Sequence, residues 1–248
     1  MVIERIQVNI FNTRTEMGIA AAKAVAATIH ALLQQQQEVN IVFAAAPSQN
    51  EFLDALATHA IDWQRVNAFH MDEYIGLEAT SPVLFARYLR TRLFEKVNCK
   101  TVNYICSSNP NPGEECLRYT ALLQNYPADI VCMGIGENNH IAFNDPPVAN
   151  FSDPLRVKIA ALDEDCRRQQ VNDGCFPVLE AVPGHAITLT VPALLDTKYI
   201  FCIVPGERKA RAVYNTFYEP IIELYPSTAL RKHPNVVMFL DKESSSRL

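Results

Sequence analysis

Short apolar runs with little alternation are the feature that most constrains what this chain can fold into. Three runs have the length of a strand and are almost continuously apolar: Ile41-Val-Phe-Ala-Ala-Ala46, Asp129-Ile-Val-Cys-Met133 and Tyr199–Val204. Strands of this kind are buried on both faces, as they are in a parallel sheet that helices cover on both sides. The pattern therefore predicts an α/β fold with a mostly parallel central sheet.

Longer helical stretches separate the apolar runs. Thr13 is placed to cap an Ala-rich helix from about Arg14 to Gln36, and Phe52, Leu53 and Leu56 have helical spacing. Further strands are expected at Ile6–Phe11, Val66–Phe69, Ala186–Val191 and Asn235–Leu240, and further helices after Pro82, after Pro192 and over Glu207–Tyr218. We find no internal repeat and no Gly- or Ser-rich linker, so the sequence predicts a single α/β domain over residues 1–248.

The net charge of the chain limits the classes of molecule that it is expected to bind. Net charge is −5 and the pI is about 5.7, which argues against binding of nucleic acid or of an anionic membrane surface. No apolar run approaches the roughly 18 residues of a membrane span, and the N-terminus lacks the pattern of a secretory signal. We expect a cytoplasmic protein. An anionic small substrate remains compatible, because it needs only a local cationic pocket.

Seven cysteines show neither C-x-x-C pairs nor zinc-ligand spacing. We therefore expect free, mostly buried thiols and no metal.

Ligands of open α/β sheets bind beyond the carboxyl ends of the strands, so the loops that follow the strands are the places to search. Ala46-Pro-Ser-Gln-Asn50 opens a helix, where free N–H groups suit a phosphate, although Ser48 or Asn50 could simply cap that helix. Met71-Asp-Glu-Tyr74 follows a strand with two adjacent carboxylates. Such a pair is either solvated or functional, since burial of charge is costly.

Two more loops carry polar groups. Gly134–Pro147 lacks the third glycine of a dinucleotide fingerprint but holds His140 among carboxyl and amide groups, which favours acid/base chemistry over a purely structural histidine. Gly206-Glu-Arg-Lys209 places two cations at the start of a helix, where they oppose the helix dipole. Arg208 and Lys209 are therefore either solvated or bound to an anion.

Taken together, these loops resemble the glucosamine-6-phosphate deaminase/isomerase family, which is related to the 6-phosphogluconolactonases. The motifs that carry the resemblance are Phe69-His-Met-Asp-Glu-Tyr-Ile-Gly-Leu77, Gly134-x-Gly-x-x-x-His-Ile-Ala-Phe-Asn-Asp-Pro146 and the weaker Gly206-x-x-Lys-Ala210. The His-Ile-Ala-Phe-Asn form is similar to the deaminase branch. The resemblance implies a Rossmann-like three-layer sandwich and a reaction without metal or cofactor.

The reaction implied is aldose–ketose isomerisation and deamination of a hexosamine 6-phosphate. By resemblance, Asp72 is the base that moves a proton between C2 and C1, and His140 is the ring-opening acid/base. Asp145 corresponds to a glutamate that sets the protonation of the histidine, and Lys209 corresponds to a phosphate ligand. Asn138 stands where the family has aspartate, beside His140.

The phosphate site departs furthest from the family pattern. Ser48 and Gln49 occupy the expected phosphate loop, whose sequence differs from the usual one. The family's phosphate-binding arginine falls near Asn172, so the neighbouring Arg168 is the expected substitute, with Arg167 beside it.

Three functions compete at this point. The favoured one is a deaminase acting on glucosamine 6-phosphate or galactosamine 6-phosphate. The second is a 6-phosphogluconolactonase-like enzyme or another sugar-phosphate isomerase. The third is a non-catalytic sugar-phosphate sensor, which Asn138 favours and which Asp72 and His140 oppose. The sequence leaves open the hexosamine epimer, allosteric regulation and a homo-oligomer.

Overall fold

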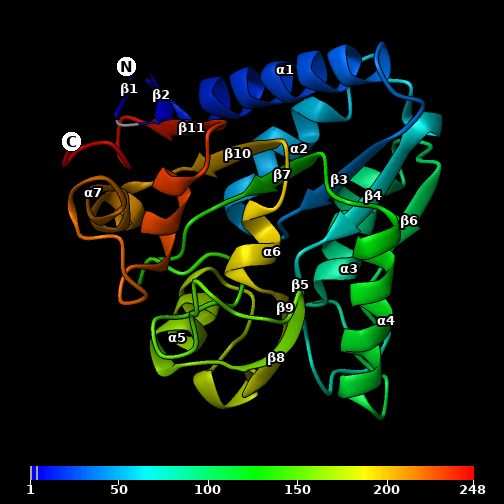
Figure 1. Ribbon diagram of the computed structural model, residues 1–248. Coiled ribbons are helices and arrows are strands. Elements are labelled where there is room, and N and C mark those ends of the chain that lie inside the picture. The colour runs from blue at the N-terminus through cyan, green and yellow to red at the C-terminus, as the bar shows by residue number, and fades with distance from the viewer. Residues whose placement is uncertain (1, 4) are drawn as a thin grey trace.

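The computed structural model describes residues 2, 3 and 5–248, with an eight-stranded sheet at its centre (Figure 1). Its strands lie in the order β1-β2-β11-β10-β7-β3-β4-β6, and all neighbours are parallel except β1 and β2. These strands are β1 (Val2–Ile3), β2 (Ile6–Phe11), β3 (Val39–Phe43), β4 (Val66–His70), β6 (Thr101–Asn103), β7 (Ile130–Met133), β10 (Tyr199–Val204) and β11 (Val236–Asp241). The predicted mostly parallel sheet is confirmed.

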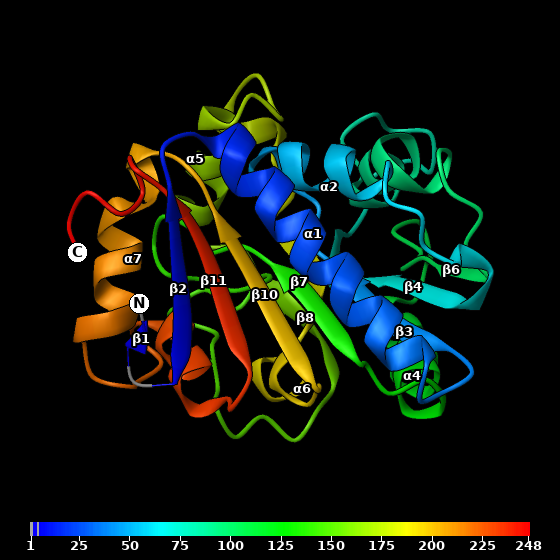
Figure 2. The same cartoon turned by 90° about the horizontal axis from the view of Figure 1, so that it is seen from above.

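Helices cover both faces of this sheet, which confirms the three-layer sandwich (Figures 1 and 2). On one face lie α1 (Arg14–Leu33) and α2 (Asn50–Leu56), which pack against each other. On the other lie α4 (Pro112–Asn125), α6 (Val191–Leu195) and α7 (Ala210–Tyr218). The Thr13 hydroxyl accepts from the Glu16 N–H at 3.1 Å and caps α1 as expected.

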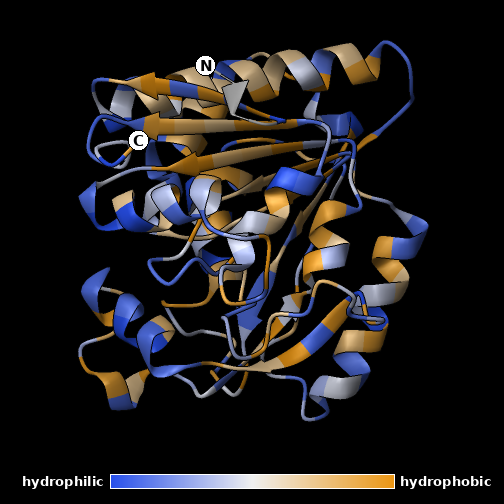
Figure 3. Cartoon of the chain, turned by 60° about the vertical axis from the view of Figure 1, so that its left-hand side comes forward, coloured by the Kyte–Doolittle hydropathy of each residue, from blue (hydrophilic) through white to orange (hydrophobic). Residues whose placement is uncertain are grey.

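The apolar runs are continuous because successive side chains enter two different cores. In β3, Ile41 and Phe43 pack beneath α1 and α2, whereas Val42 belongs to the core on the opposite face with Leu123 of α4 and Val213 of α7. Both faces of the strand must therefore be apolar. Figure 3 shows this hydrophobic character along the strands of the large sheet.

A second, three-stranded antiparallel sheet was not anticipated. It has the order β5-β9-β8 and consists of β5 (Asp72–Tyr74), β9 (His185–Leu189) and β8 (Val157–Ala161). The expected strand at Ala186–Val191 is thus β9, in this small sheet. Since β5 follows β4 after a single residue, Met71, the chain passes directly from the large sheet into the small one.

Three helices and one polar run differ from expectation. Helix α3 (Phe85–Leu89) begins at Phe85 rather than after Pro82, and it continues as a π turn over Arg90–Phe94. Helices α4 and α5 (Glu164–Asn172) had not been anticipated. The expected helix to Gln36 ends at Leu33, because the Gln36 amide instead donates to Glu38 O at 2.7 Å and Asp129 Oδ2 at 2.9 Å.

Within the described residues, α1 is the one helix long and apolar enough to cross a membrane by length and composition alone. This modifies the expectation that nothing in the chain could do so. Core helices meet the same criterion, and α1 buries Met17, Val25 and Ile29 inside the protein. All seven cysteines are free, and four of them are buried.

Candidate active site

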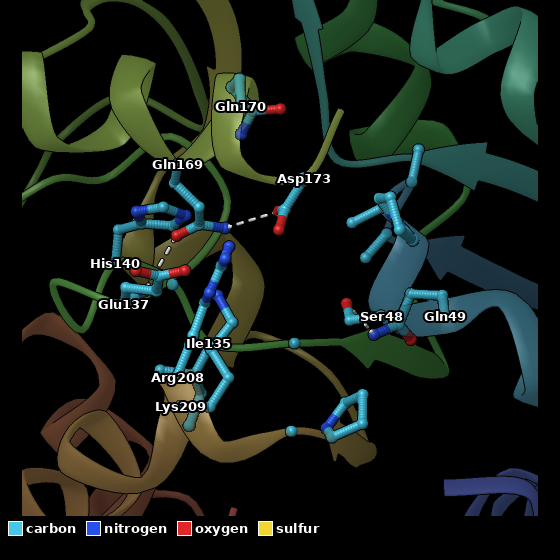
Figure 4. A pocket seen from close by; sticks show the side chains of 18 of the residues that line it. Ser48, Gln49, Ile135, Glu137, His140, Gln169, Gln170, Asp173, Arg208 and Lys209 are labelled. Atoms are coloured by element: carbon cyan, nitrogen blue, oxygen red, sulfur yellow. Dashed lines mark hydrogen bonds between the residues drawn. The ribbon is translucent and has the colours of Figure 1, made fainter. Parts of the chain in front are cut away.

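A cavity of about 400 Å³ lies beyond the carboxyl ends of β3, β4, β7 and β10. All four loops singled out in the sequence reach it, and the end of α5 closes one side (Figure 4). Parallel strands bring their carboxyl ends to the same edge of a sheet, so loops distant in sequence meet there. The members of the cavity wall that the following paragraphs use are Ser48, Gln49, Asp72, Gly136, Glu137, His140, Gln169, Asp173, Arg208 and Lys209.

Asp72 is the first residue of β5 and lines the cavity while only 7% exposed. Burial raises the pKa of its carboxyl well above the ordinary value near 3.8, and the charge of the adjacent Glu73 raises it further. Asp72 has no ion-pair partner among the described residues, and a carboxylate with a raised pKa takes up a proton readily. Asp72 is thus suited to proton transfer.

His140 is held by an amide and a carboxylate together. Its Nδ1 lies 2.7 Å from Asn138 Oδ1 and 3.0 Å from Asp145 Oδ1, and Asn138 Nδ2 donates to the same Asp145 oxygen at 3.1 Å. Because two acceptors face Nδ1, we assign the ring hydrogen to it, which leaves Nε2 for a ligand. Asn138 therefore orients the ring, and Asp145 supplies the negative charge.

Asp145 is fully buried. Burial raises the pKa of its carboxyl, but the charge of His140 and hydrogen bonds from His140 and Asn138 outweigh that effect, so the pKa lies below its usual range. The ionised form is thus favoured next to the imidazole.

The loop that carries His140 is strained and firmly held. Asn139 and Ala142 have positive φ angles of 70° and 48°; asparagine tolerates this left-handed region, whereas it is unfavourable for alanine. The Asn139 side chain fixes the loop by donating to Ala212 O and Ser227 Oγ, both at 2.8 Å, and by accepting from Asn215 at 2.9 Å. A Cβ atom at Gly136 would lie 2.2 Å from His140 Cε1, so the ring packs directly on this glycine.

Ser48 and Gln49 form a short 3₁₀ turn, Pro47–Gln49, on the opposite side of the cavity from His140 (Figure 4). Gln49 is 1% exposed, and its Nε2 lies 3.1 Å from both Ser48 Oγ and Ile203 O. No partner for Gln49 Oε1 exists within the described residues. The turn offers a half-buried hydroxyl and a fixed amide to a ligand.

Arg208 and Lys209 enter the cavity from the 3₁₀ turn Glu207–Lys209 (Figure 4). Gly206 begins the turn with φ of 91°, a value that favours glycine, and its N–H donates to Asp241 Oδ2 at 2.9 Å. Burial lowers the pKa of Lys209, while the charges of Asp173 and Glu137 oppose that effect. A buried ammonium gains from an anionic ligand, which replaces the solvation it has lost.

Arg168 is not at the cavity, contrary to expectation. It is exposed on α5 and paired with Glu164 one turn away, and Arg167 is bound to the carbonyl oxygens of Leu179 and Val182. The structure brings Arg208 there instead. Its guanidinium lies 3.4 Å from the carbonyl oxygen of Asn172, the residue at which the resemblance places the family's arginine.

Two other residues that line the cavity, Gln169 and Asp173, were not identified from the sequence. Gln169 Oε1 accepts from the Glu137 N–H at 2.9 Å, and Gln169 Nε2 lies 3.4 Å from Asp173 Oδ2 (Figure 4). These contacts connect the end of α5 to the Gly134–Glu137 loop. Only the 3.6-residue period of a helix could have pointed to them, and α5 was not anticipated.

One group of possible metal ligands exists in the described part of the chain: His140, Asp145 and Cys166, whose polar atoms all lie within 4.8 Å of one another. Two of the three are already paired with each other. We interpret this group as a hydrogen-bonded histidine–carboxylate pair with a buried thiol beside it.

The fold and the cavity define an α/β protein that places a buried carboxylate, a histidine paired with a second carboxylate, and two cations around one pocket. The family model described as glucosamine-6-phosphate isomerases/6-phosphogluconolactonase matches residues 12–238, and the chain belongs to this family. The resemblance inferred from the motifs is confirmed.

Relatives by sequence include glucosamine-6-phosphate deaminases. The one from an Exiguobacterium species is 35% identical over 188 residues, 76% of this chain and 72% of the relative. The one from Listeria monocytogenes serotype 4a is 33% identical over 85% of this chain and 88% of the relative. The chain is therefore an enzyme of this family.

The fold is also similar to those of solved structures. A monomeric glucosamine-6-phosphate deaminase superposes with a TM-score of 0.89 at 27% identity, covering 98% of this chain and 100% of that one. The 6-phosphogluconolactonase of Thermotoga maritima gives 0.79 at 18% identity over 96% of this chain and 100% of its own, which shows the shared fold alone.

Proposed function

We propose that the protein converts glucosamine 6-phosphate, or its galacto epimer, to a ketose 6-phosphate and ammonia. The observation that carries the proposal is that Asp72 and the His140–Asp145 pair line or support one cavity that Ser48, Gln49, Arg208 and Lys209 also line. The sequence relatives named above support the same substrate class.

The chemistry follows from these groups. His140 Nε2 transfers the proton that opens the sugar ring, with Asp145 stabilising the charged imidazole. Asp72 then removes the proton from C2 and returns it to C1, because one carboxylate can reach two adjacent carbons. With a proton passing from the ammonium group to the C1 oxygen, this shift leaves a hydroxyl at C1 and an imine at C2. Water adds to the imine carbon and ammonia leaves, so that a ketone remains at C2.

The phosphate binds between the Pro47–Gln49 turn and the Glu207–Lys209 turn in this proposal. Lys209 and Arg208 supply positive charge, and Arg208 replaces the Arg168 of the sequence-based hypothesis. Electrostatic complementarity of this kind accounts for substrate orientation without a metal ion. A cytoplasmic location and the oligomeric state stay predictions.

An ammonia-release assay on a panel of phosphates tests the proposal. The panel is glucosamine 6-phosphate, galactosamine 6-phosphate and 6-phosphogluconolactone, each with and without a chelator. We expect ammonia from a hexosamine phosphate, with no effect of the chelator. Lactone hydrolysis without ammonia would support the lactonase alternative, and tight binding of a hexosamine phosphate without turnover would support the sensor.

A further inference from the structure

The position of Asp72 depends on the strand that carries it rather than on partners of its own side chain. No hydrogen bond or ion pair to the Asp72 carboxylate exists among residues 2, 3 and 5–248. Its strand β5 lies at the edge of the small sheet and is bonded on one side only, where Leu189 N donates to Met71 O at 2.8 Å and Ile75 N donates to His185 O at 3.1 Å. The other edge must be held by something else.

The neighbouring Glu73 holds that edge. Its Oε1 accepts from the Tyr74 N–H at 3.0 Å and the Phe85 N–H at 3.1 Å, and its Oε2 accepts from the Ala86 N–H at 2.9 Å. Glu73 is 1% exposed and borders a separate cavity of about 290 Å³, because successive side chains of a strand point to opposite sides. It therefore lies behind the base rather than beside the substrate.

Helix α3 extends this connection across the active-site cavity. Its first residues, Phe85 and Ala86, donate to Glu73, and Phe85 also lines the active-site cavity. One turn further on, the Tyr88 hydroxyl lies 2.7 Å from Ala46 O and 2.6 Å from Asn50 Oδ1. These two residues flank the Pro47–Gln49 turn. One short helix thus connects the strand of the base to the loop assigned to the phosphate.

We infer that Glu73 is a positioning residue that fixes Asp72 relative to the phosphate loop through α3 and Tyr88. The inference rests on the proposed function. A base that serves two adjacent carbons must be placed to within a fraction of an ångström of a substrate anchored at its distant phosphate. The connection through α3 sets that separation.

Glu73→Gln tests the inference, with Glu115→Gln as the matched control. Both glutamates are 1% exposed and accept backbone N–H groups, but Glu115 bonds Cys106 N and Arg118, away from the active-site cavity. A glutamine at 73 cannot accept at both side-chain atoms, so one backbone N–H loses its acceptor. For Glu73→Gln we expect kcat and the exchange of the substrate C2 hydrogen with solvent to fall by about 10- to 100-fold, with little change in KM. The control should retain both rates.

Tyr88→Phe tests the same connection from its other end, and it decides the matter if Glu73→Gln does not fold. It removes the bond to the phosphate loop while keeping the ring, so kcat and the C2 exchange should fall as they do for Glu73→Gln, and KM should also rise because the loop itself is assigned to the phosphate. The double variant should be less than additive, because both changes break one connection.

Equal kcat values for Glu73→Gln and Glu115→Gln, or an unchanged kcat for Tyr88→Phe, would overturn the inference. Wild-type protein in the same assay distinguishes failure of the proposed function from failure of the inference about Glu73. An inactive wild type would contradict the proposed function itself, whereas an active wild type with an equally active Glu73→Gln contradicts only the role of Glu73.

Discussion

Burial of the Asp72 carboxylate affects both catalysis and stability. The burial that raises its pKa also makes its ionised form unfavourable in the folded state. For Asp72→Asn, turnover should fall by about 10²–10⁴-fold, the usual contribution of a general base, while substrate binding survives. The measurement is kcat together with wash-in of deuterium at C2 of the substrate. Asp173→Asn, which removes a different carboxylate from the same cavity, should retain the exchange.

The same substitution should change stability in a pH-dependent way. The folded-state pKa of Asp72 lies well above its ordinary value near 3.8, so its stabilising contribution is complete below that value and is lost as pH rises through the folded pKa. Asparagine does not titrate. Asp72→Asn should therefore gain thermal stability over wild type progressively from about pH 4 upward, as measured by unfolding scans across pH.

Asp54 provides an opposite control for that measurement. Burial raises the pKa of Asp54, but hydrogen bonds from Lys96 and Arg92 outweigh this and lower it. Its contribution is present above its unfolded value and is lost as pH falls, so Asp54→Asn should lose stability toward neutral pH. The same direction of change for both variants would contradict the assignment.

A substitution at Asn138 tests whether the protein is an active enzyme or a non-catalytic sensor. Asn138→Asp places a second carboxylate 2.7 Å from His140 Nδ1 and favours the charged imidazole. The acid limb of the pH–rate profile should move to higher pH if neutral His140 is the active form. Superimposable profiles for both proteins would show that residue 138 has no influence on the histidine during turnover.

Among the structural elements, the Glu207–Lys209 turn is the one on which the proposed phosphate-binding site depends most. Lys209→Ala should weaken binding of glucosamine 6-phosphate by roughly 10- to 150-fold, which corresponds to about 1.5–3 kcal/mol for a charge-assisted contact. Arg168→Ala, which removes a cation from exposed α5, should leave KM unchanged. Equal affinity for glucosamine with and without its phosphate would refute the assignment.

The elements differ in how far the sequence determined them. Strand β10 matches its predicted bounds, because an uninterrupted apolar run is typical of a strand buried on both faces. Strand β5 was not separable from the preceding strand, since three residues carry no periodic signal. Arg168 was placed at the site because it lies near Asn172, where the resemblance places the family's arginine. Adjacent residues of a helix differ by about 100° in direction, and the structure shows that Gln169 rather than Arg168 faces the cavity.

At the scale of the whole molecule, residues 1–248 should unfold as one unit. The single tryptophan, Trp63, lies in the core beneath α1 and outside the cavity lining, so its fluorescence reports on a remote part of the chain. Glucosamine 6-phosphate at 100 times its Kd should stabilise the unreactive Asp72→Asn protein by about 2.7 kcal/mol, or about 5–10 °C. Fluorescence and circular dichroism should show the same shift. Two transitions of which only one responds to ligand would indicate two independent units.

The contact between Gly136 and the imidazole ring also limits how this chain can diverge. Any substitution at 136 adds at least a Cβ, which would lie 2.2 Å from His140 Cε1 and displace the ring. Asn138 already carries a Cβ, so a substitution there does not by itself introduce this clash. Because even the smallest side chain at 136 would displace the ring, we expect this position to stay glycine in every homologue that retains His140.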